Sequence, residues 1–228
     1  MSALCGGLLV TVLNALDSGH REILIVRHGA TRLNNDDVSV DRIRGWKDVP
    51  LSADGRKEAE RLADELVKHK PAGIVSSDLC RAYDTAKIIS DKTKVPIEDV
   101  SKVFRPWNLG IYAGELSKKA IPIIAAYATD KPAVKIPDGE SFENFAARFM
   151  GGLHEVLDEF KGLLAVVTHH RGERLLMAWK KAGYPVDGEI DRGEFTKKGE
   201  HTGTVQKYSV PLVRLRAAAN VLARRGGK

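Results

Sequence analysis

Reactive side chains gather in three short stretches of the sequence, each directly after an apolar run. Arg27-His28-Gly29 follows the first run, Ser76-Ser77-Asp78 with Arg81 follows the second, and Thr168-His169-His170 follows the third. Arginine presents a planar fork of donors that matches phosphate oxygens two at a time. A neutral imidazole is a competent nucleophile toward phosphorus. If the three stretches meet in space, they can bind and transfer a phosphoryl group.

The residue types suggest a role for each group. Arg27 and Arg81 suit a phosphate clamp, and their positive charges disfavour the protonated form of His28, which should therefore stay neutral near pH 7. The same charges stabilise the transferring phosphoryl group. The sequence has no His and Cys cluster with the spacing of a zinc site, and the chemistry needs no metal. We therefore expect no metal and no other cofactor.

The three stretches can meet if the apolar runs are neighbouring strands of a parallel sheet. Residues 22–26, 73–76 and 162–168 are short and apolar, which is typical of buried strands, and helical periodicity follows the second and third runs. In an open parallel sheet the ligand site lies at the carboxyl ends of the strands. Taken singly, an Arg-His pair is usually an exposed loop, and a histidine after a strand can cap the next helix. The combination of all three strand ends favours a functional site.

Periodicity and turn residues predict further elements. Ser52 is typical of an N-cap, here for a helix that ends near Lys68. We expect a short strand at Val103-Phe104 and a helix that begins near Ser141. Residues 204–210 alternate between apolar and polar side chains, which predicts an outer strand of the same sheet.

The composition is that of an ordinary folded domain. A chain of 228 residues, 43% hydrophobic and 29% charged, is long enough for one sizeable α/β domain. With only Cys5 and Cys80 we expect no disulfide framework, and Cys80 is more typical of a buried thiol than of a nucleophile. Residues 1–20 form an N-terminal extension, expected as a short helix, whose apolar part is too short to span a bilayer. A degenerate export signal is the alternative to the cytoplasmic, membrane-free protein that we expect.

The C-terminal end is basic. The formal net charge is +6, and the alanine-rich stretch at 212–228 contributes Arg214, Arg216, Arg224, Arg225 and Lys228. Such a tail can bind the phosphates of nucleic acid or anionic lipid. A solvated helix or a frayed end is the simpler interpretation. We therefore predict a basic C-terminal tail, and it is the one feature that would favour a nucleic-acid partner, which we do not otherwise expect.

The sequence resembles the histidine phosphatase superfamily, the phosphoglycerate-mutase-like group, in the branch with an Arg-His-Gly motif. The resemblance covers about residues 23–210 and rests on five matching stretches, which are residues 26–34, 50–55, 76–86, 138–141 and 166–169. It implies a three-layer α/β/α sandwich with a mostly parallel central sheet. It also implies a domain over residues 21–211 with a lid insertion at about 106–140.

The resemblance further implies roles for particular residues. His28 would accept the phosphoryl group and form a phosphohistidine. The other positions carried over are Arg27, Arg81 and His169 as phosphate ligands, Asn34 as a polar contact, and Arg44 and Gly45 at the substrate entrance.

One departure from the family pattern concerns the proton donor. The family usually places a glutamate at the position that Pro106 occupies here, and proline cannot donate a proton to the leaving oxygen. Glu140 is the first substitute, although a carboxylate there could simply serve the start of the following helix. His170 is the second substitute, because a histidine at this position could shuttle protons. Asp48 and Glu115 are weaker candidates.

Three interpretations of the function are open at this point. The leading one is a metal-independent phosphatase that hydrolyses phosphomonoesters through a phosphohistidine on His28. A mutase would share the pocket but needs the missing acid in both directions, and a non-catalytic phosphate-binding module would have no need for a free nucleophile. We expect a small-molecule phosphate ester as substrate. The positive charges of Lys47 and Arg32 would favour an anionic substrate, and aromatic side chains of the lid would pack on its organic part. A homodimer is compatible with the sequence.

Overall fold

Five strands form one mixed sheet in the order β3-β2-β4-β1-β5 in the computed structural model, which describes residues 19–34, 39–197 and 201–227. All neighbouring pairs are parallel except β1 and β5. β5 is therefore the outer strand predicted from the alternating segment, and β4 is central. The strands are β1 His20–Arg27, β2 Gly73–Ser77, β3 Ile97–Ser101, β4 Leu164–Thr168 and β5 Val205–Pro211. The predicted N-terminal helix and Cys5 lie outside the described residues.

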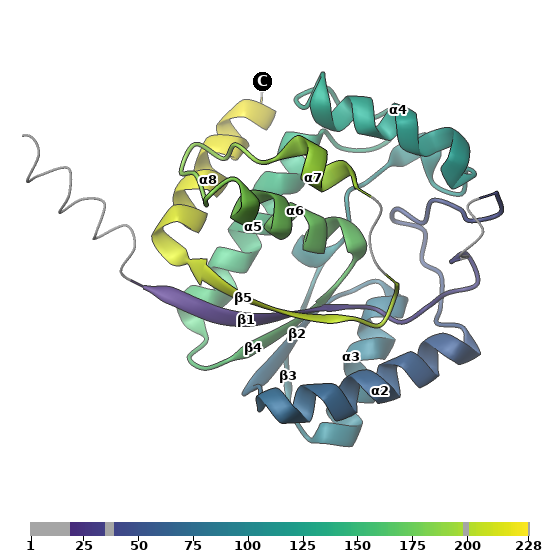
Figure 1. The fold of residues 1–228 in the computed structure, drawn as a ribbon, viewed down its shortest axis with the longest axis vertical. Helices are drawn as coiled ribbons and strands as arrows, with labels where there is room; N and C mark the ends of the chain where they lie inside the picture. Colours follow the sequence, from purple (N-terminus) through teal and green to yellow (C-terminus); the bar gives the residue numbers. More distant parts are fainter. Residues whose placement is uncertain (1–18, 35–38, 198–200, 228) are drawn as a thin grey trace, which may run out of the picture.

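Helices cover both faces of this sheet (Figure 1). In β1, Leu24 and Val26 pack in the core beneath α2 and α3, whereas Ile23 and Ile25 pack in the core shared with α5, α6 and α8. This period of two follows from the pleat of the strand and confirms the predicted three-layer α/β/α sandwich. The helices are α2 Ala53–His69, α3 Cys80–Thr93, α4 Ser117–Thr129, α5 Phe142–Glu159, α6 His170–Lys181, α7 Arg192–Thr196 and α8 Leu212–Gly226.

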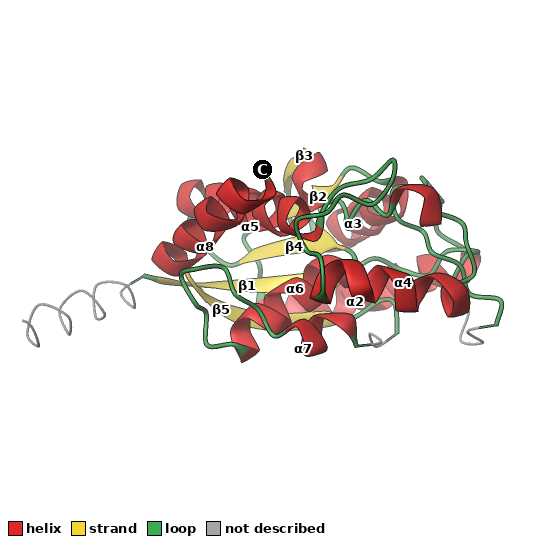
Figure 2. Cartoon of the chain, turned by 90° about the horizontal axis from the view of Figure 1, so that it is seen from above, coloured by secondary structure: helices red, strands yellow, loops and turns green. Residues whose placement is uncertain are grey.

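The three strands with reactive ends are neighbours. β4 pairs with both β1 and β2, and Arg27 at the end of β1 lies opposite Thr168 at the end of β4. Figures 1 and 2 place α4 toward the end of the molecule to which β1 runs, opposite the end that carries α8. The predicted convergence of the three strand ends at one edge of the sheet is therefore confirmed.

Helix starts follow the predicted caps. The Ser52 side chain accepts a hydrogen bond from the Gly55 amide at 3.0 Å at the start of α2. The Ser141 side chain accepts one from the Asn144 amide at 3.1 Å at the start of α5. Each cap satisfies one of the amides that a helix leaves without an internal partner.

The strand predicted at Val103-Phe104 is wrong. The strand in this region is β3 at Ile97–Ser101, and Lys102–Phe104 form a 3-10 turn. The Ser101 side chain accepts a hydrogen bond from the Val103 amide, which turns the chain out of the sheet. Phe104 is buried because its ring packs on Phe149 of α5, and not because it lies in a strand.

The basic C-terminal tail is also wrong as predicted, because residues 212–226 form the packed helix α8. Leu215, Ala218 and Leu222 are buried against the core, and α8 makes extensive contact with α5. Arg216 and Arg224 lie on the exposed side of the helix. The apolar side chains recur at helical spacing between the arginines, so the arginines mark the outer face of an amphipathic helix. Among the described residues no helix is both long and apolar enough to cross a membrane.

The packing of α8 predicts unequal effects of two substitutions on the same helix. Leu215→Ala should lower the free energy of unfolding by about 2–5 kcal/mol, because it leaves a cavity under the helix. Arg224→Gln on the exposed face should change it by no more than about 0.5 kcal/mol. Urea denaturation followed by circular dichroism would measure both, and equal stabilities would contradict the packed helix.

Candidate active site

A cavity of about 600 Å³ lies at the carboxyl ends of β1, β2 and β4. Eight of the residues predicted for the site line it: Arg27, His28, Asn34, Arg44, Gly45, Arg81, His169 and His170. The ninth, Glu140, is not among the lining residues. The sequence stretches that carry these side chains are far apart along the chain, and the sheet brings them together.

His28 is held as a neutral imidazole with its nucleophilic nitrogen available. Its Nδ1 lies 2.7 Å from the Gly29 carbonyl oxygen, and a carbonyl only accepts, so Nδ1 carries the proton. The lone pair is therefore on Nε2. Burial, and then the charge of Arg81, hold the pKa of His28 well below its usual range. A buried neutral imidazole with a free Nε2 is the form that attacks phosphorus.

His169 faces His28 across the site. The two ring centroids are 5.0 Å apart, and His169 Nε2 lies 2.9 Å from the Ser77 hydroxyl. Its Nδ1 is buried and has no hydrogen-bond partner in the described protein. Burial and the charge of Arg81 hold the pKa of His169 well below its usual range. His169 is also the N-cap of α6, whose free amides and dipole favour an anion at this point.

Arg81 is oriented by two backbone carbonyls. Its Nη1 donates to the Lys47 carbonyl at 2.8 Å and its Nη2 donates to the Gly45 carbonyl at 2.9 Å. The side chain is buried, and burial lowers its pKa to about 10, so it keeps its charge at neutral pH. Gly45 therefore contributes through its carbonyl, which fixes the direction of the Arg81 fork.

The loop that carries His28 is fixed by a close approach of two glycines. A Cβ on Gly29 would lie 2.2 Å from the Gly55 carbonyl oxygen, and a Cβ on Gly55 would lie 2.0 Å from the Ala30 carbonyl oxygen. Any larger residue at either position must displace the backbone. The Gly29 amide also donates to the Thr85 hydroxyl at 3.1 Å, which ties the loop to α3. This packing fixes the carbonyl that orients His28.

Asn34 and Arg44 line the cavity and are engaged in local bonds. Asn34 Oδ1 accepts from the Thr31 amide at 3.0 Å and from its hydroxyl at 2.8 Å, which closes the turn after His28. Arg44 Nη1 lies 2.8 Å from Asp41 Oδ1, and the other carboxylate oxygen of Asp41 accepts from the Ser117 hydroxyl. Arg44 is thus charge-compensated by a partner that the sequence analysis did not foresee.

Glu140 does not fit the predicted role of proton donor. Its Oε1 lies 2.6 Å from Arg148 Nη2 and accepts from the Asn108 amide at 2.8 Å. These bonds occupy the Glu140 carboxylate and hold the 106–140 region onto α5. Pro106 itself lines the cavity at the position where a family acid would stand. Of the weaker candidates, Asp48 accepts from the Cys80 amide at the start of α3, and neither Asp48 nor Glu115 lines the cavity.

His170 lies in the cavity as predicted, at the first position of α6. Its Nδ1 is buried and has no hydrogen-bond partner in the described protein. Burial, and then the charge of Arg27, hold the pKa of His170 well below its usual range. The imidazole is therefore neutral near pH 7, and its predicted role as a proton shuttle stays a prediction.

Comparison with known proteins places this constellation in a family. The model of the histidine phosphatase superfamily (branch 1) matches residues 23–189. The chain belongs to the histidine phosphatase superfamily. It is 35% identical over 162 residues to phosphoglycerate mutase-like protein 4 of Arabidopsis thaliana, covering 68% of this chain and 69% of that one. It is 32% identical over 163 residues to a metal-independent phosphoserine phosphatase of the same plant, covering 69% of this chain and 67% of that one.

The fold of this histidine phosphatase also matches solved structures. A mycobacterial glucosyl-3-phosphoglycerate phosphatase in complex with VO3 superposes with a TM-score of 0.64 at 27% identity, over 82% of this chain and 92% of that chain. The predicted phosphoglycerate-mutase-like fold is thereby confirmed.

Sequence reasoning missed four charged residues of the cavity, which are Asp41, Glu58, Arg171 and Lys197. Glu58 accepts from the Ala30 amide at 2.8 Å through Oε2, next to the His28 loop. Arg171 directly follows His169-His170 in the sequence, so its place in the same motif was the available signal. Asp41 and Glu58 carried no such signal, because each lies outside the three reactive stretches.

The lowered pKa values of three histidines in the cavity predict a loss of stability in acid. The unfolded chain takes up protons below about pH 6.5 that folded His28, His169 and His170 do not, so stability falls as pH falls below that value. His170→Asn should remove about 1 kcal/mol of this loss between pH 6.5 and 5.5. Urea denaturation at several pH values would measure it, and parallel stability curves for the two proteins would contradict it.

Proposed function

We propose that this histidine phosphatase hydrolyses small-molecule phosphomonoesters without a metal, through a phosphohistidine on His28. The observation that carries the proposal is the fixed tautomer of His28, whose Nδ1 donates to the Gly29 carbonyl and leaves Nε2 free in a cavity with Arg81 and His169. The relatives support it, because they include a metal-independent phosphoserine phosphatase and a glucosyl-3-phosphoglycerate phosphatase.

The reaction would proceed by two in-line transfers. In the first, His28 Nε2 attacks phosphorus, the ester P–O bond breaks, and the alcohol leaves after taking up one proton from solvent. In the second, water attacks phosphorus, the N–P bond breaks, and inorganic phosphate, neutral His28 and one proton are released. Arg27, Arg81 and His169 would hold the three peripheral oxygens and stabilise their charge in both transition states.

The proton for the leaving oxygen is the difficult part of the first transfer. General acid catalysis typically contributes about 10²- to 10⁴-fold in rate. With Pro106 in the family's acid position, an alcohol of high pKa must leave with less assistance than in relatives that keep the glutamate. Activated aryl esters need little protonation and would be affected least.

Proline at position 106 also distinguishes between a phosphatase and a mutase. A mutase transfers the phosphoryl group out to an alcohol and back, so it needs proton transfer at the leaving oxygen in both directions. A hydrolase needs it once. The position of Pro106 in the cavity therefore favours hydrolysis.

The decisive test is hydrolysis of p-nitrophenyl phosphate in the presence of a chelator. We expect turnover by the unmodified protein that resists the chelator, and a loss of about 10³-fold or more in His28→Ala, because this variant lacks the proposed phosphoryl acceptor. His69→Ala at the exposed end of α2 is the control and should retain activity. Phosphate binding without turnover would identify a binding module instead.

A second test addresses the missing acid. Pro106→Glu should raise kcat/KM on ethyl phosphate by about 10-fold or more, with a smaller gain on p-nitrophenyl phosphate, because only the poor leaving group needs a proton. Pro106→Gln matches the size of the new side chain but cannot donate in the same way. If glutamate and glutamine change the ratio of the two substrates equally, the account of Pro106 is wrong.

A further inference from the structure

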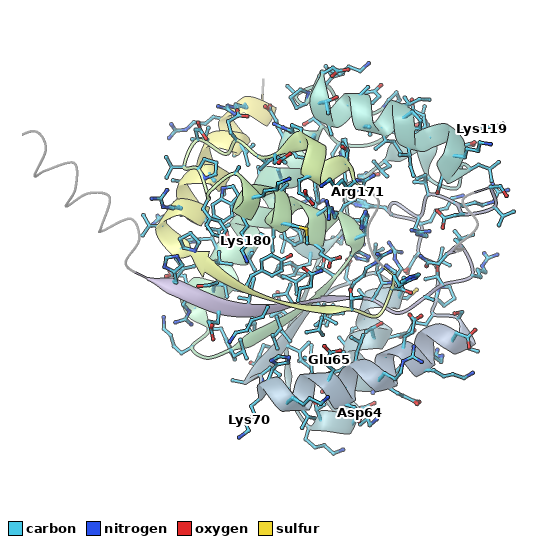
Figure 3. All side chains as sticks on the ribbon, in the orientation of Figure 1. Asp64, Glu65, Lys70, Lys119, Arg171 and Lys180 are labelled. Atoms are coloured by element: carbon cyan, nitrogen blue, oxygen red, sulfur yellow. The ribbon has the colours of Figure 1, made fainter. Side chains whose placement is uncertain are left out.

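Arg171 is a cavity residue that the proposed reaction does not use. It is the second residue of α6, directly after His169-His170, and its side chain lines the same cavity as His28. Figure 3 shows it near the start of α6, beside α7. Phosphoryl transfer as described needs Arg27 and Arg81 but assigns nothing to this third guanidinium.

Arg171 has no anionic partner in the part of the chain that the structure describes. Its Nη1 donates to the Phe195 carbonyl at 3.2 Å, and its guanidinium carbon lies 5.2 Å from the centre of the Phe195 ring. None of the ion pairs among the described residues includes it. Burial, and then the charges of Arg174, Arg44 and Arg27, lower its pKa to about 10.

Unlike Arg171, three neighbouring arginines have a carboxylate that balances their positive charge. Arg44 pairs with Asp41, Arg148 pairs with Glu140 and Arg174 pairs with Glu194. Arg81 pairs with no carboxylate in the described chain, and it is the residue that clamps the phosphate in the proposed function. Arg171 shares with Arg81 a place in the cavity and the lack of a carboxylate partner, which indicates that it too receives its anion from the ligand.

The helix adds to this charge imbalance. Arg171 stands in the first turn of α6, where the helix dipole and the free amides already favour negative charge. A cation there is unfavourable, and no ion pair among the described residues joins Arg171 to the buried Glu173 in the same turn, so an anion bound beside Arg171 would be favourable. At the rim of the cavity Lys197 lies 2.8 Å from Glu194, whose carboxylate also pairs with Arg174 and Lys181. Lys181 pairs with Asp191 as well, so three cations share two carboxylates.

We propose that Arg171, with Lys197 at the rim, binds a second anionic group on the substrate. The inference rests on the proposed phosphatase activity and names its substrate class: phosphomonoesters whose alcohol carries a carboxylate or a second phosphate. The ester phosphate binds at Arg81 and His28, and the second anion binds at Arg171 in the same cavity. A guanidinium binds either oxyanion with two parallel hydrogen bonds, so the shared chemistry is an anion with paired oxygens.

The test compares substrates that differ only in the second anion. Phosphoglycolate and ethyl phosphate have the same length, and only phosphoglycolate carries a carboxylate. Ethane-1,2-diol bisphosphate and ethane-1,2-diol monophosphate give the corresponding comparison for a second phosphate. For the unmodified protein, kcat/KM should be higher for the member of each pair with the second anion, and the larger ratio identifies which anion the site prefers.

Arg171→Gln should reduce the preferred ratio by about 10- to 100-fold, the effect expected for a hydrogen-bonded charge pair. Arg171→Lys keeps the charge but loses the fork, and should restore only part of the preference. Arg61→Gln on the exposed side of α2 makes the same change of residue and net charge away from the cavity, and should leave the ratio unchanged. Equal ratios in the unmodified protein and Arg171→Gln would overturn the proposal.

The experiments distinguish failure of the proposed phosphatase function from failure of the proposed second-anion site. If p-nitrophenyl phosphate is not hydrolysed, the proposed function is wrong, and calorimetric binding of phosphoglycolate and ethyl phosphate then tests Arg171. Phosphoglycolate should bind more tightly to the unmodified protein, and Arg171→Gln should remove the difference. Equal binding of the two esters by the unmodified protein would overturn the second subsite whether or not the protein is an enzyme.

Discussion

The hydrogen bond from His28 Nδ1 to the Gly29 carbonyl is the interaction on which the proposed chemistry of this protein depends. It decides which ring nitrogen carries the proton and therefore which one can attack phosphorus. The carbonyl is in place because the loop after β1 packs against the start of α2, where Gly29 and Gly55 approach too closely for a side chain at either position. The proposed nucleophile is thus oriented by backbone packing and not by a neighbouring general base.

The electrostatics of the cavity reinforce this preparation. Two buried arginines and the N-terminus of α6 create a positive field, and burial alone already disfavours a charged imidazole. Among the described residues, the hydrogen bonds that Arg81 donates go to two carbonyl oxygens and to no carboxylate, so burying its charge is costly. In the proposed reaction a bound phosphate dianion would offset this cost by pairing with Arg81. Substrate binding would then also relieve the charge repulsion in the cavity.

The sequence predicts the fold and most of the site because those features depend on local sequence patterns. Short apolar runs with polar ends identify the parallel strands, and three neighbouring strand ends bring His28, Arg81 and His169 together.

Features that depend on contacts between distant segments could not be predicted from the sequence. Glu140 looks like an available carboxylate until Arg148, eight residues later on α5, binds it. The C-terminal arginines look like a tail because their charge masks the apolar stripe that packs α8 onto α5. Arg171 was missed because adjacency to the motif does not reveal the absence of a carboxylate partner.

The missing acid and the excess of positive charge are physically linked. A carboxylate at position 106 would donate a proton to the leaving oxygen, but in its ionised form it would also raise the pKa of His28 and weaken the field that binds the phosphate. With proline there, the proposed nucleophile would stay neutral to lower pH and the cavity would hold the dianion more strongly. The charge that develops on the leaving oxygen would then be stabilised by the positive field of the cavity until the oxygen takes up its proton from solvent. A guanidinium such as that of Arg171, bound to the second anion of the alcohol, would contribute to this stabilisation. It would hold the leaving oxygen inside the positive field of the cavity while the P–O bond breaks.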